Sequence, residues 1–476
     1  MKKVLLALLC SICLLACKEK QSIEWVMTTP DVAWQMVEEV EVAGDNTSMI
    51  DVEIDADHPL QVIDGFGSCF NECGWLSLDL LSSADKDEIF KELFQLGYGA
   101  NFTICRMPIA ANDFATEWYS YNENEGDFAM EKFSIERDKK GLIPFIHEAL
   151  KYNKQLKLWA SPWSPPVWMK YNKHYACNLN RDGVNDKFYN GLLPEQQGME
   201  GTNMFIQEDP YFEAYALYFA KFIEAYRKQD INISMVMPQN EFNSCQVFPS
   251  CTWTAEGLNR FVGDFLGPKM KEIGVGLMFG TVERANTLLV DTLLKDPKSS
   301  QYIQGVGFQW AGKHAIGKIH QENPSLTIYQ TEQECGDGRN DWKTCLYSWS
   351  LMKHYLSNGA NVYTYWNTSL VKDYISRWGW KQNSLISVDP ETKTYKYNYE
   401  YYLMKHASHY VLPGAHLLPV SGSYDDVLAF RNSDGSFVLV LCNKDEAIKN
   451  LKLKVGDSVL SLSLQANSIN TIHIKK

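Results

Sequence analysis

The apolar and polar positions of this chain switch repeatedly between the two-residue period of strands and the 3.6-residue period of helices. Between residues 60 and 405, eight short apolar segments predict strands. Helical stretches separate them, and in one of these, which Ser83 would cap, the apolar residues between 89 and 94 share a face. Eight strand–helix repeats predict a (β/α)8 TIM barrel with its chemistry at the carboxyl ends of the strands. The predicted strands are residues 61–66, 101–106, 157–162, 234–240, 275–281, 305–309, 327–332 and 361–366.

Both flanks of this region have the pattern of half-buried strands. Residues 22–58 alternate between apolar and polar, and residues 410–476 contain further short strands separated by polar turns. We expect an all-β sandwich domain built from both chain ends, around a catalytic barrel at residues 60–405. Residues 171–209 are rich in Asn, Gly and charge, which predicts a long loop over the substrate cleft after the third strand.

The first residues have the pattern of an export signal. Two lysines precede the apolar run 4–15, which is too short to span a membrane as a helix. The run ends in Leu-Leu-Ala-Cys, which resembles a bacterial lipobox with Cys17 as the lipidated residue. We therefore expect residues 1–16 to be a lipoprotein signal peptide, with an ordinary signal peptide as the alternative. The body would be exported and lipid-anchored to a bacterial membrane, on its periplasmic or outer surface.

The charge, the cysteine spacing and the motifs limit which partners, metals and cofactors the protein could bind. The 476-residue chain has 58 acidic and 45 basic residues, which argues against nucleic acid because a phosphate-binding surface concentrates Lys and Arg. Nine of the twelve cysteines follow Cys17, and their spacing leaves disulfide pairing open and does not match a zinc site. A Gly-rich phosphate loop and a dinucleotide fingerprint are also lacking, so we infer no metal and no cofactor.

Two glutamates stand at the ends of predicted strands. Glu241 follows the fourth strand and Glu332 ends the seventh, which places both across the mouth of one barrel. Two carboxyls facing a sugar bond can divide the work of glycoside cleavage between a proton donor and a nucleophile. Glu334 is a rival for Glu332, because residues two apart on a strand point the same way.

Several motifs together resemble glycoside hydrolase family 30, which includes glucosylceramidases, β-1,6-glucanases, β-xylosidases and glucuronoxylanases. They are Asp64-Gly65-Phe66-Gly67, the segment from Arg106 to Phe114, Ser161-Pro162-Trp163-Ser164-Pro165-Pro166, Gln239-Asn240-Glu241 and Thr331-Glu332. The resemblance implies a barrel fused to a β-sandwich and a retaining double displacement without metal. It also implies that Glu241 is the acid/base and Glu332 the nucleophile, and the Thr-Glu match favours Glu332 over Glu334.

The resemblance also implies the substrate contacts. Asn240 would hold the sugar's 2-hydroxyl, Arg106 would keep the nucleophile ionised, and Asp113 with Trp163 would hold the non-reducing sugar. Trp366 and Asn367 would form the far wall. The tryptophans expected around the mouth, where they would contact sugar or pack in loops, are Trp118, Trp163, Trp168, Trp310, Trp366, Trp378 and Trp380.

Two positions depart from the family pattern. Phe242 stands where many members have Pro, and Ala311 stands where glucosylceramidases have a Tyr that hydrogen-bonds the nucleophile. The missing hydroxyl weakens a close comparison with glucosylceramidases but leaves the mechanism intact.

The function that we expect is a lipid-anchored, retaining hydrolase of β-glucosidic linkages, with β-1,6-glucan as the first substrate. A glucosylceramidase-like or simple β-glucosidase activity and a xylan-directed activity are alternatives within the family. The non-enzymatic alternatives are a surface glycan-binding lipoprotein and a structural protein with an inert barrel. The sequence leaves open whether cleavage is internal or terminal, and it leaves the oligomeric state open.

Overall fold

The computed structural model describes residues 22–38, 41–43, 49–179, 188–456 and 458–475, so Cys17 and the predicted signal peptide lie outside the described residues. Eight parallel strands close into a barrel in the order β10-β11-β12-β13-β6-β7-β8-β9, which confirms the predicted architecture. Their bounds are β6 Gly65–Cys69, β7 Ile104–Ile109, β8 Lys157–Pro162, β9 Met235–Val236, β10 Gly276–Val282, β11 Ile303–Gln309, β12 Thr327–Glu332 and β13 Val362–Asn367.

The prediction for the first strand is wrong in its first half. Val62–Ile63 forms β5, which pairs with a strand of the sandwich, and the barrel strand β6 begins only at Gly65. Two glycines let β6 lie close to β7, because a Cβ on Gly67 would stand 1.7 Å from the Ile104 carbonyl oxygen.

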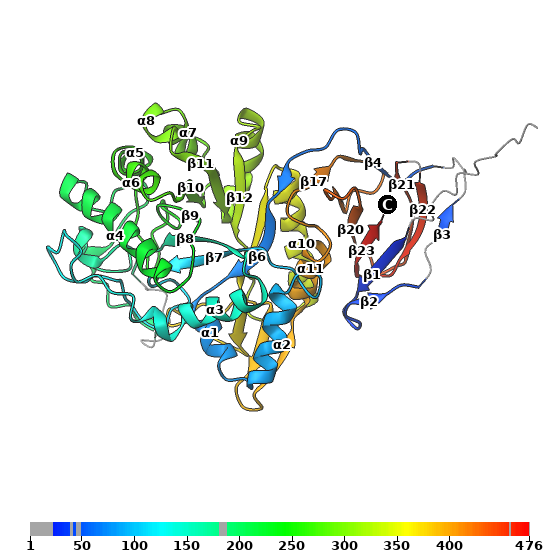
Figure 1. The fold of residues 1–476 in the computed structure, drawn as a ribbon, viewed down its shortest axis with the longest axis horizontal. Helices are drawn as coiled ribbons and strands as arrows, with labels where there is room; N and C mark the ends of the chain where they lie inside the picture. The colour runs from blue at the N-terminus through cyan, green and yellow to red at the C-terminus, as the bar shows by residue number, and fades with distance from the viewer. Residues whose placement is uncertain (1–21, 39–40, 44–48, 180–187, 457, 476) are drawn as a thin grey trace, which may run out of the picture.

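Helices surround the barrel (Figure 1). The helix that covers residues 83–94 is capped by Ser82, not by Ser83, since Ser82 Oγ accepts from the Asp85 backbone N–H at 3.1 Å. A π-helical segment, Phe261–Leu266, separates two of the helices. The helices are α1 Glu72–Leu78, α2 Ser83–Phe94, α3 Leu142–Tyr152, α4 Asp209–Arg227, α5 Ala255–Arg260, α6 Gly267–Glu272, α7 Leu288–Leu294, α8 Pro297–Ser300, α9 Ile316–Glu322, α10 Trp342–Ser357 and α11 Tyr399–Ser408.

Both chain ends build the β-sandwich. One sheet has the order β2-β1-β23-β20-β19-β17-β5, and the other has the order β18-β4-β21-β22-β3. The early strands are β1 Ile23–Thr28, β2 Gln35–Met36, β3 Glu41–Ala43 and β4 Val52–Ile54. The late strands are β17 Ala415–Leu418, β18 Val420–Gly422, β19 Val427–Arg431, β20 Phe437–Asn443, β21 Lys449–Val455, β22 Ser458–Leu464 and β23 Ser468–Ile474.

A small sheet beside the barrel was not predicted from the sequence. It has the order β14-β15-β16, with β14 Ser369–Val371, β15 Ile386–Asp389 and β16 Thr394–Tyr397. The parallel pairing of β14 with β15 holds both ends of the intervening loop, residues 372–385, which contains Trp380 and Gln382.

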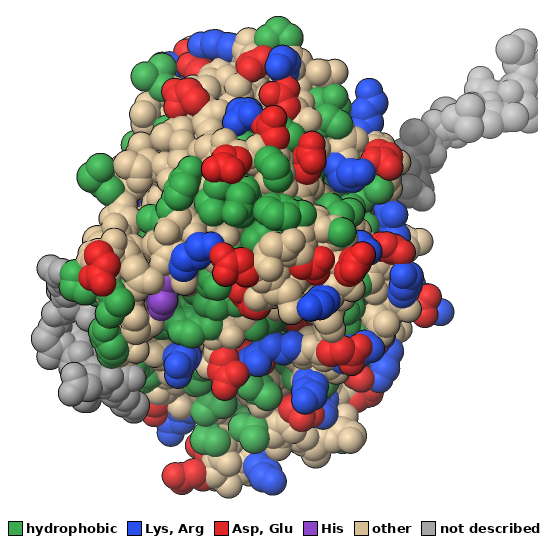
Figure 2. Space-filling view, turned by 90° about the vertical axis from the view of Figure 1, so that its left-hand side faces the viewer, with side chains coloured by type: hydrophobic (Ala, Val, Ile, Leu, Met, Phe, Trp, Pro, Cys, Tyr) green, Lys and Arg blue, Asp and Glu red, His purple; other side chains and the backbone are tan. Residues whose placement is uncertain are grey.

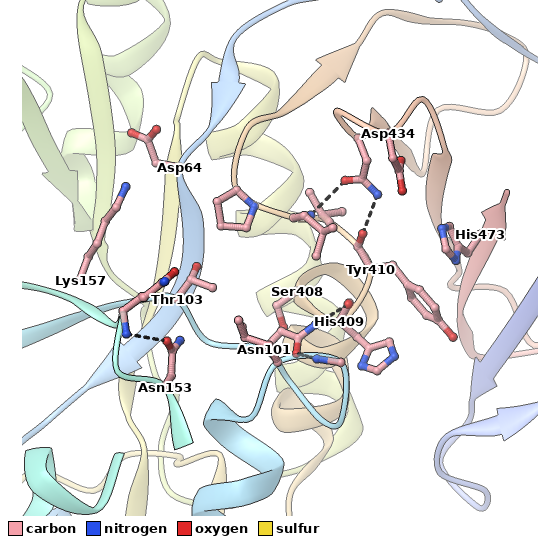
Figure 3. A pocket seen from close by; sticks show the side chains of 17 residues that line it. Asp64, Asn101, Thr103, Asn153, Lys157, Ser408, His409, Tyr410, Asp434 and His473 are labelled. Atoms are coloured by element: carbon pink, nitrogen blue, oxygen red, sulfur yellow. Dashed lines mark hydrogen bonds between the residues drawn. The ribbon is translucent and has the colours of Figure 1, made fainter. Parts of the chain in front are cut away.

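The barrel and the sandwich lie side by side, with α10 and α11 between them (Figure 1). A cavity of about 590 Å³ opens at this junction, at the amino-terminal end of the barrel strands (Figure 3). Polar side chains from the barrel and from the sandwich both bind the segment at the end of α11; for example, Asn101 donates to the His409 carbonyl at 2.6 Å and Asn432 to the Tyr410 carbonyl at 2.9 Å. Its polar lining therefore serves to join the two domains.

The surface and the cysteines add two observations. Basic and acidic side chains are interspersed over the face shown in Figure 2. All nine cysteines of the described residues are free thiols, and eight of them are buried. In the described part of the chain, no helix has the length and hydrophobicity needed to cross a membrane.

Candidate active site

The predicted carboxyls meet in a cavity of about 440 Å³ at the carboxyl end of the barrel strands. Seven residues expected at the site or around its mouth line this cavity, namely Asp113, Trp163, Asn240, Glu241, Trp310, Glu332 and Trp380. The remaining lining residues are Ser244, Gln246, Phe248, Glu283, Arg284, Ala311, Lys313 and Gln382.

Glu241 is held on a strained backbone. Its φ of 47° lies in the left-handed region that non-glycine residues rarely adopt, and such strain concentrates at functional sites. The Thr281 hydroxyl accepts from the Glu241 backbone N–H at 2.9 Å. The carboxyl is 6% exposed and accepts hydrogen bonds from Gln309 Nε2 at 3.1 Å and Gln246 Nε2 at 3.2 Å.

Glu332 is the last residue of β12 and lies among donors. Its Oε2 accepts from the Arg106 guanidinium at 2.9 Å and from Gln309 Nε2 at 3.2 Å. Its Oε1 accepts from the Trp310 indole N–H at 3.1 Å. Three donors on one carboxyl stabilise its ionised form.

Arg106 lies beneath the cavity and is fully buried. Besides Glu332, its guanidinium donates to Asn240 Oδ1 at 2.7 Å and to Ser161 Oγ at 2.9 Å. The guanidinium carbon lies 4.5 Å from the centre of the Trp163 ring. One cation therefore positions three of the predicted site residues at once.

The two glutamates differ in what stabilises their charge. Burial raises the pKa of Glu241 well above its ordinary value, and the charges of Glu332 and Glu283 raise it further. Burial also raises the pKa of Glu332, but Arg106 and the Trp310 N–H oppose that rise. The pair is therefore arranged for Glu332 to ionise first while Glu241 keeps its proton.

Asp113 is the third acid of the cavity. Burial and the nearby Glu332 charge raise its pKa well above the ordinary value. Its Oδ1 is buried without a hydrogen-bond partner, so an acceptor or, when protonated, a donor is available to a ligand.

Trp366 and Asn367 lie behind the cavity and do not line it. Trp366 is fully buried and stacks on Trp163, with ring centres 5.2 Å apart. Asn367 donates to Gln382 Oε1 at 2.9 Å, and Gln382 lines the cavity. Both residues thus support the wall from behind.

Three of the mouth tryptophans pack against protein and lie outside the cavity lining. Trp118 and Trp378 contact each other, with ring centres 4.9 Å apart. Trp168 packs against Tyr211, and its indole N–H donates to the Asn122 carbonyl at 2.9 Å. These residues fit the packing interpretation of the tryptophan-rich mouth.

Glu334 is turned away from Glu332. It pairs with Lys313 at 2.6 Å and accepts from the Tyr347 hydroxyl at 2.7 Å. Strand β12 ends at Glu332, so the rule that residues two apart point the same way no longer applies beyond it.

Several polar residues of the site had no predicted role. Gln309 ends β11 and donates to both glutamates, Thr281 lies in β10, and Glu283 directly follows β10. All three stand at carboxyl ends of barrel strands, so the rule that identified Glu241 and Glu332 could also have identified them. Within the described residues, no group of three or more His, Cys, Asp or Glu side chains is placed to hold a metal ion.

Comparison with known proteins agrees with this geometry. Residues 63–411 match the glycosyl hydrolase family 30 TIM-barrel domain, and residues 420–472 match the glycosyl hydrolase family 30 beta sandwich domain. The lysosomal acid glucosylceramidase of Mus musculus is 26% identical over 87% of this chain and 80% of its own length. The endo-1,6-beta-D-glucanase of Neurospora crassa is 24% identical over 86% of this chain and 85% of its own length.

A solved structure has the same fold. The endo-beta1,6-glucanase BT3312 superposes with a TM-score of 0.80 at 24% identity, covering 95% of this chain and all of that one.

Proposed function

Because the chain belongs to glycosyl hydrolase family 30 and is therefore an O-glycosyl hydrolase with a carbohydrate substrate, we propose that it cleaves β-glucosidic linkages with retention. We propose β-1,6-glucan as its first substrate. Two relatives named as endo-1,6-glucanases support this choice. Each matches most of the chain, with about one quarter of the aligned residues identical.

One contact carries the retaining mechanism. The same nitrogen, Gln309 Nε2, lies 3.1 Å from an oxygen of Glu241 and 3.2 Å from an oxygen of Glu332. The two oxygens are therefore at most about 6.3 Å apart, which is below the roughly 6.5–9.5 Å by which inverting enzymes separate their carboxyls to admit a water. The shared donor thus supports direct attack by one carboxyl.

In the proposed reaction, the ionised Glu332 attacks the anomeric carbon and Glu241 gives its proton to the departing glycosidic oxygen. The sugar is then bound covalently to Glu332. Water attacks the same carbon, Glu241 takes the water's proton, and the bond to Glu332 breaks. Arg106 stabilises the carboxylate of Glu332 before the attack and after the release.

A glucosylceramidase-like activity is the second candidate, and its support is the similarity to the mouse lysosomal enzyme. Ala311 lines the cavity where the glucosylceramidases have a Tyr, so this part of the wall is more open here. A glycan-binding protein without activity is disfavoured, because binding alone does not need two carboxyls that share one donor.

The test is turnover by the purified protein on a panel of β-glucans, xylan, glucosylceramide and nitrophenyl β-glucoside. NMR of the first product distinguishes retention from inversion. We expect a β-anomer from a β-glucan, released most rapidly from the β-1,6-linked polymer. An α-anomer would exclude double displacement, and glycan binding without turnover would support the non-enzymatic alternative.

We also propose that the protein is exported and anchored to a bacterial membrane through lipid on Cys17. The support is the lipobox-like Leu-Leu-Ala-Cys sequence after a short apolar run. A polysaccharide too large to enter a cell would be accessible to an enzyme held in this way.

A further inference from the structure

The cavity contains a buried carboxyl that the double displacement does not use. Glu283 is 1% exposed, and its Oε1 accepts hydrogen bonds from the Asn243 backbone N–H at 3.1 Å and from Ser244 Oγ at 3.0 Å. Its Oε2 is buried and has no hydrogen-bond partner. A buried carboxyl oxygen left unpaired is costly in free energy, so this atom needs a partner that a ligand could supply.

The barrel topology places Glu283 on a different part of the cavity wall from the residues proposed to hold the reacting sugar, because β10 lies two strands from β8 and three strands from β7. In the closed barrel, β10 and β11 lie opposite β6 and β7. Asp113 follows β7 and Trp163 follows β8, whereas Glu283 follows β10 and Ala311 follows β11. A sugar held by Asp113 and Trp163 would therefore direct its leaving group towards the wall formed by the loops after β10 and β11.

This wall has no unpaired cation among its described residues. Arg284 is ion-paired with Glu200 and also lies 3.9 Å from Glu283 Oε1, and Lys313 is ion-paired with Glu334. Both cations that could bind an acidic leaving group are therefore already paired with carboxylates. A neutral hydroxyl could bind Glu283 Oε2 without disturbing either ion pair.

We propose that Glu283 binds a hydroxyl of the sugar on the leaving side of the scissile bond, in a subsite that Ala311 leaves open. This inference rests on the proposed hydrolase function and specifies its leaving group. A saccharide satisfies Glu283 Oε2, whereas an aryl group or a lipid chain leaves that oxygen unpaired. Glu283 thus favours oligo- and polysaccharides over glucosides with an apolar leaving group.

The protonation state of Glu283 is compatible with this role. Burial raises the pKa of its carboxyl to about 7. Near neutral pH the group can therefore accept from a sugar hydroxyl when ionised or donate to one when protonated.

The first test compares two substrates with full-length protein. Glu283→Gln keeps an oxygen for Asn243 and Ser244, whereas Glu283→Leu removes every polar atom. We expect both variants to lose about tenfold or more in kcat/KM on a β-1,6-linked glucose disaccharide. On nitrophenyl β-glucoside, which has no sugar in this subsite, the loss should stay within about threefold when each protein is measured at its own pH optimum, because the Glu283 charge also contributes to the raised pKa of Glu241.

Glu400 provides a matched control. It is a fully buried glutamate on α11 with one unpaired oxygen and a pKa that burial raises to about 7, but it does not line the cavity. Glu400→Gln should change the kcat/KM values of the two substrates by the same factor. Thermal melting of each variant shows whether it is folded.

A second measurement works even if Glu283→Leu fails to fold. With nitrophenyl β-glucoside as donor and methyl β-glucoside as acceptor, the acceptor hydroxyl replaces water. The bond between Glu332 and the anomeric carbon breaks, the carbon bonds to the acceptor oxygen, and Glu241 takes the proton. We expect Glu283→Gln to lower the ratio of transfer to hydrolysis by about tenfold, an effect that a purely structural role would not produce.

The outcomes separate the two proposals. Equal losses on both substrates, or an unchanged ratio of transfer to hydrolysis, would overturn the role of Glu283 while leaving the hydrolase function intact. A wild-type protein that cleaves neither substrate would overturn the proposed function, and the subsite with it.

Discussion

At the scale of single residues, two glutamates separated by one position have very different surroundings. Glu332 lines the cavity and receives hydrogen bonds from Arg106, Gln309 and Trp310. Glu334 does not line the cavity and is bound by Lys313 and Tyr347. Only the first lies in the cavity where we propose that the sugar binds.

Glu332→Gln should therefore lower kcat by about 1,000-fold or more with every leaving group, because an amide cannot form the covalent intermediate. Glu334→Gln is the matched control and should stay within about tenfold of the wild type. The measurement is kcat of the wild type and of both variants on nitrophenyl β-glucoside. An active Glu332→Gln together with an inactive Glu334→Gln would reverse the assignment.

Glu241→Ala should retain the first step with a very good leaving group, because such a group departs without a proton. External azide should then speed up the second step, and a glycosyl azide should accumulate.

The wild type should lose kcat/KM at alkaline pH as Glu241 deprotonates. This loss should occur well above the ordinary pKa range of a Glu, since burial and Glu332 raise the pKa of Glu241. An alkaline limb that persists in Glu241→Ala would show that another group titrates.

At the scale of elements, two tryptophans lie on loops with different roles. Trp163 follows β8 and is buried between Trp366 and Arg106. Trp380 lies in the loop between β14 and β15, is 40% exposed, and contacts Phe248 at the rim of the cavity. We propose that the first contacts the reacting sugar and that the second contacts sugars further along a chain.

Trp163→Ala should lower kcat/KM on every substrate by about 100-fold, because the contact serves the reacting sugar. Trp380→Ala should lower kcat/KM on long glucans by about tenfold and leave nitrophenyl β-glucoside nearly unchanged, because only the longer chain reaches the rim. The measurement is kcat/KM against glucan length. Equal losses of Trp380→Ala on both substrates would make this residue part of the packing alone.

At the scale of the whole molecule, His406 joins the barrel to the sandwich. It lies on α11, is fully buried, and its two ring nitrogens lie 2.9 Å from the hydroxyls of Thr471 and Thr28. Burial lowers the pKa of His406 to about 3. The folded protein thus holds this ring neutral at pH values where an unfolded chain, with an ordinary pKa near 6.5, would protonate it.

The contribution of His406 to stability is therefore fully present above pH 6.5 and is lost as the pH falls from 6.5 towards 3. Between pH 6.5 and 5 this loss amounts to about 2 kcal/mol of unfolding free energy. Denaturant titrations at pH 7 and pH 5 measure how much unfolding free energy the protein loses between these two pH values. This loss should be smaller in His406→Gln than in the wild type by about the same amount. An identical pH dependence in both proteins would mean that other groups carry it.

Cys17→Ala should move the protein from the membrane fraction to the soluble fraction, because we propose one N-terminal lipid unit as its anchor. Fractionation of cells that express the two forms, followed by immunoblotting, measures the change. A mutant that still partitions with the membrane would be attached by another means.

How much could be predicted from the sequence depends on whether a feature is local. The strand and helix periods lie in contiguous residues, so the eight barrel strands and most of the sandwich strands were recognisable. The pattern predicts one barrel strand that includes Val62–Ile63, and this is wrong because a single apolar run contributes β5 to the sandwich and β6 to the barrel. The sheet of β14, β15 and β16 was missed because its strands are short and joined by a long loop.

The sequence by itself determined the barrel, the sandwich made from both chain ends, and the pairing of Glu241 with Glu332, because strand order and strand ends follow from local patterns. Only the tertiary structure decided how the side chains at those ends meet. It placed Gln309 between the two glutamates, turned Glu334 towards Lys313, and left an oxygen of Glu283 unpaired in the cavity. These contacts join residues from different strands, so they arise only when the barrel closes.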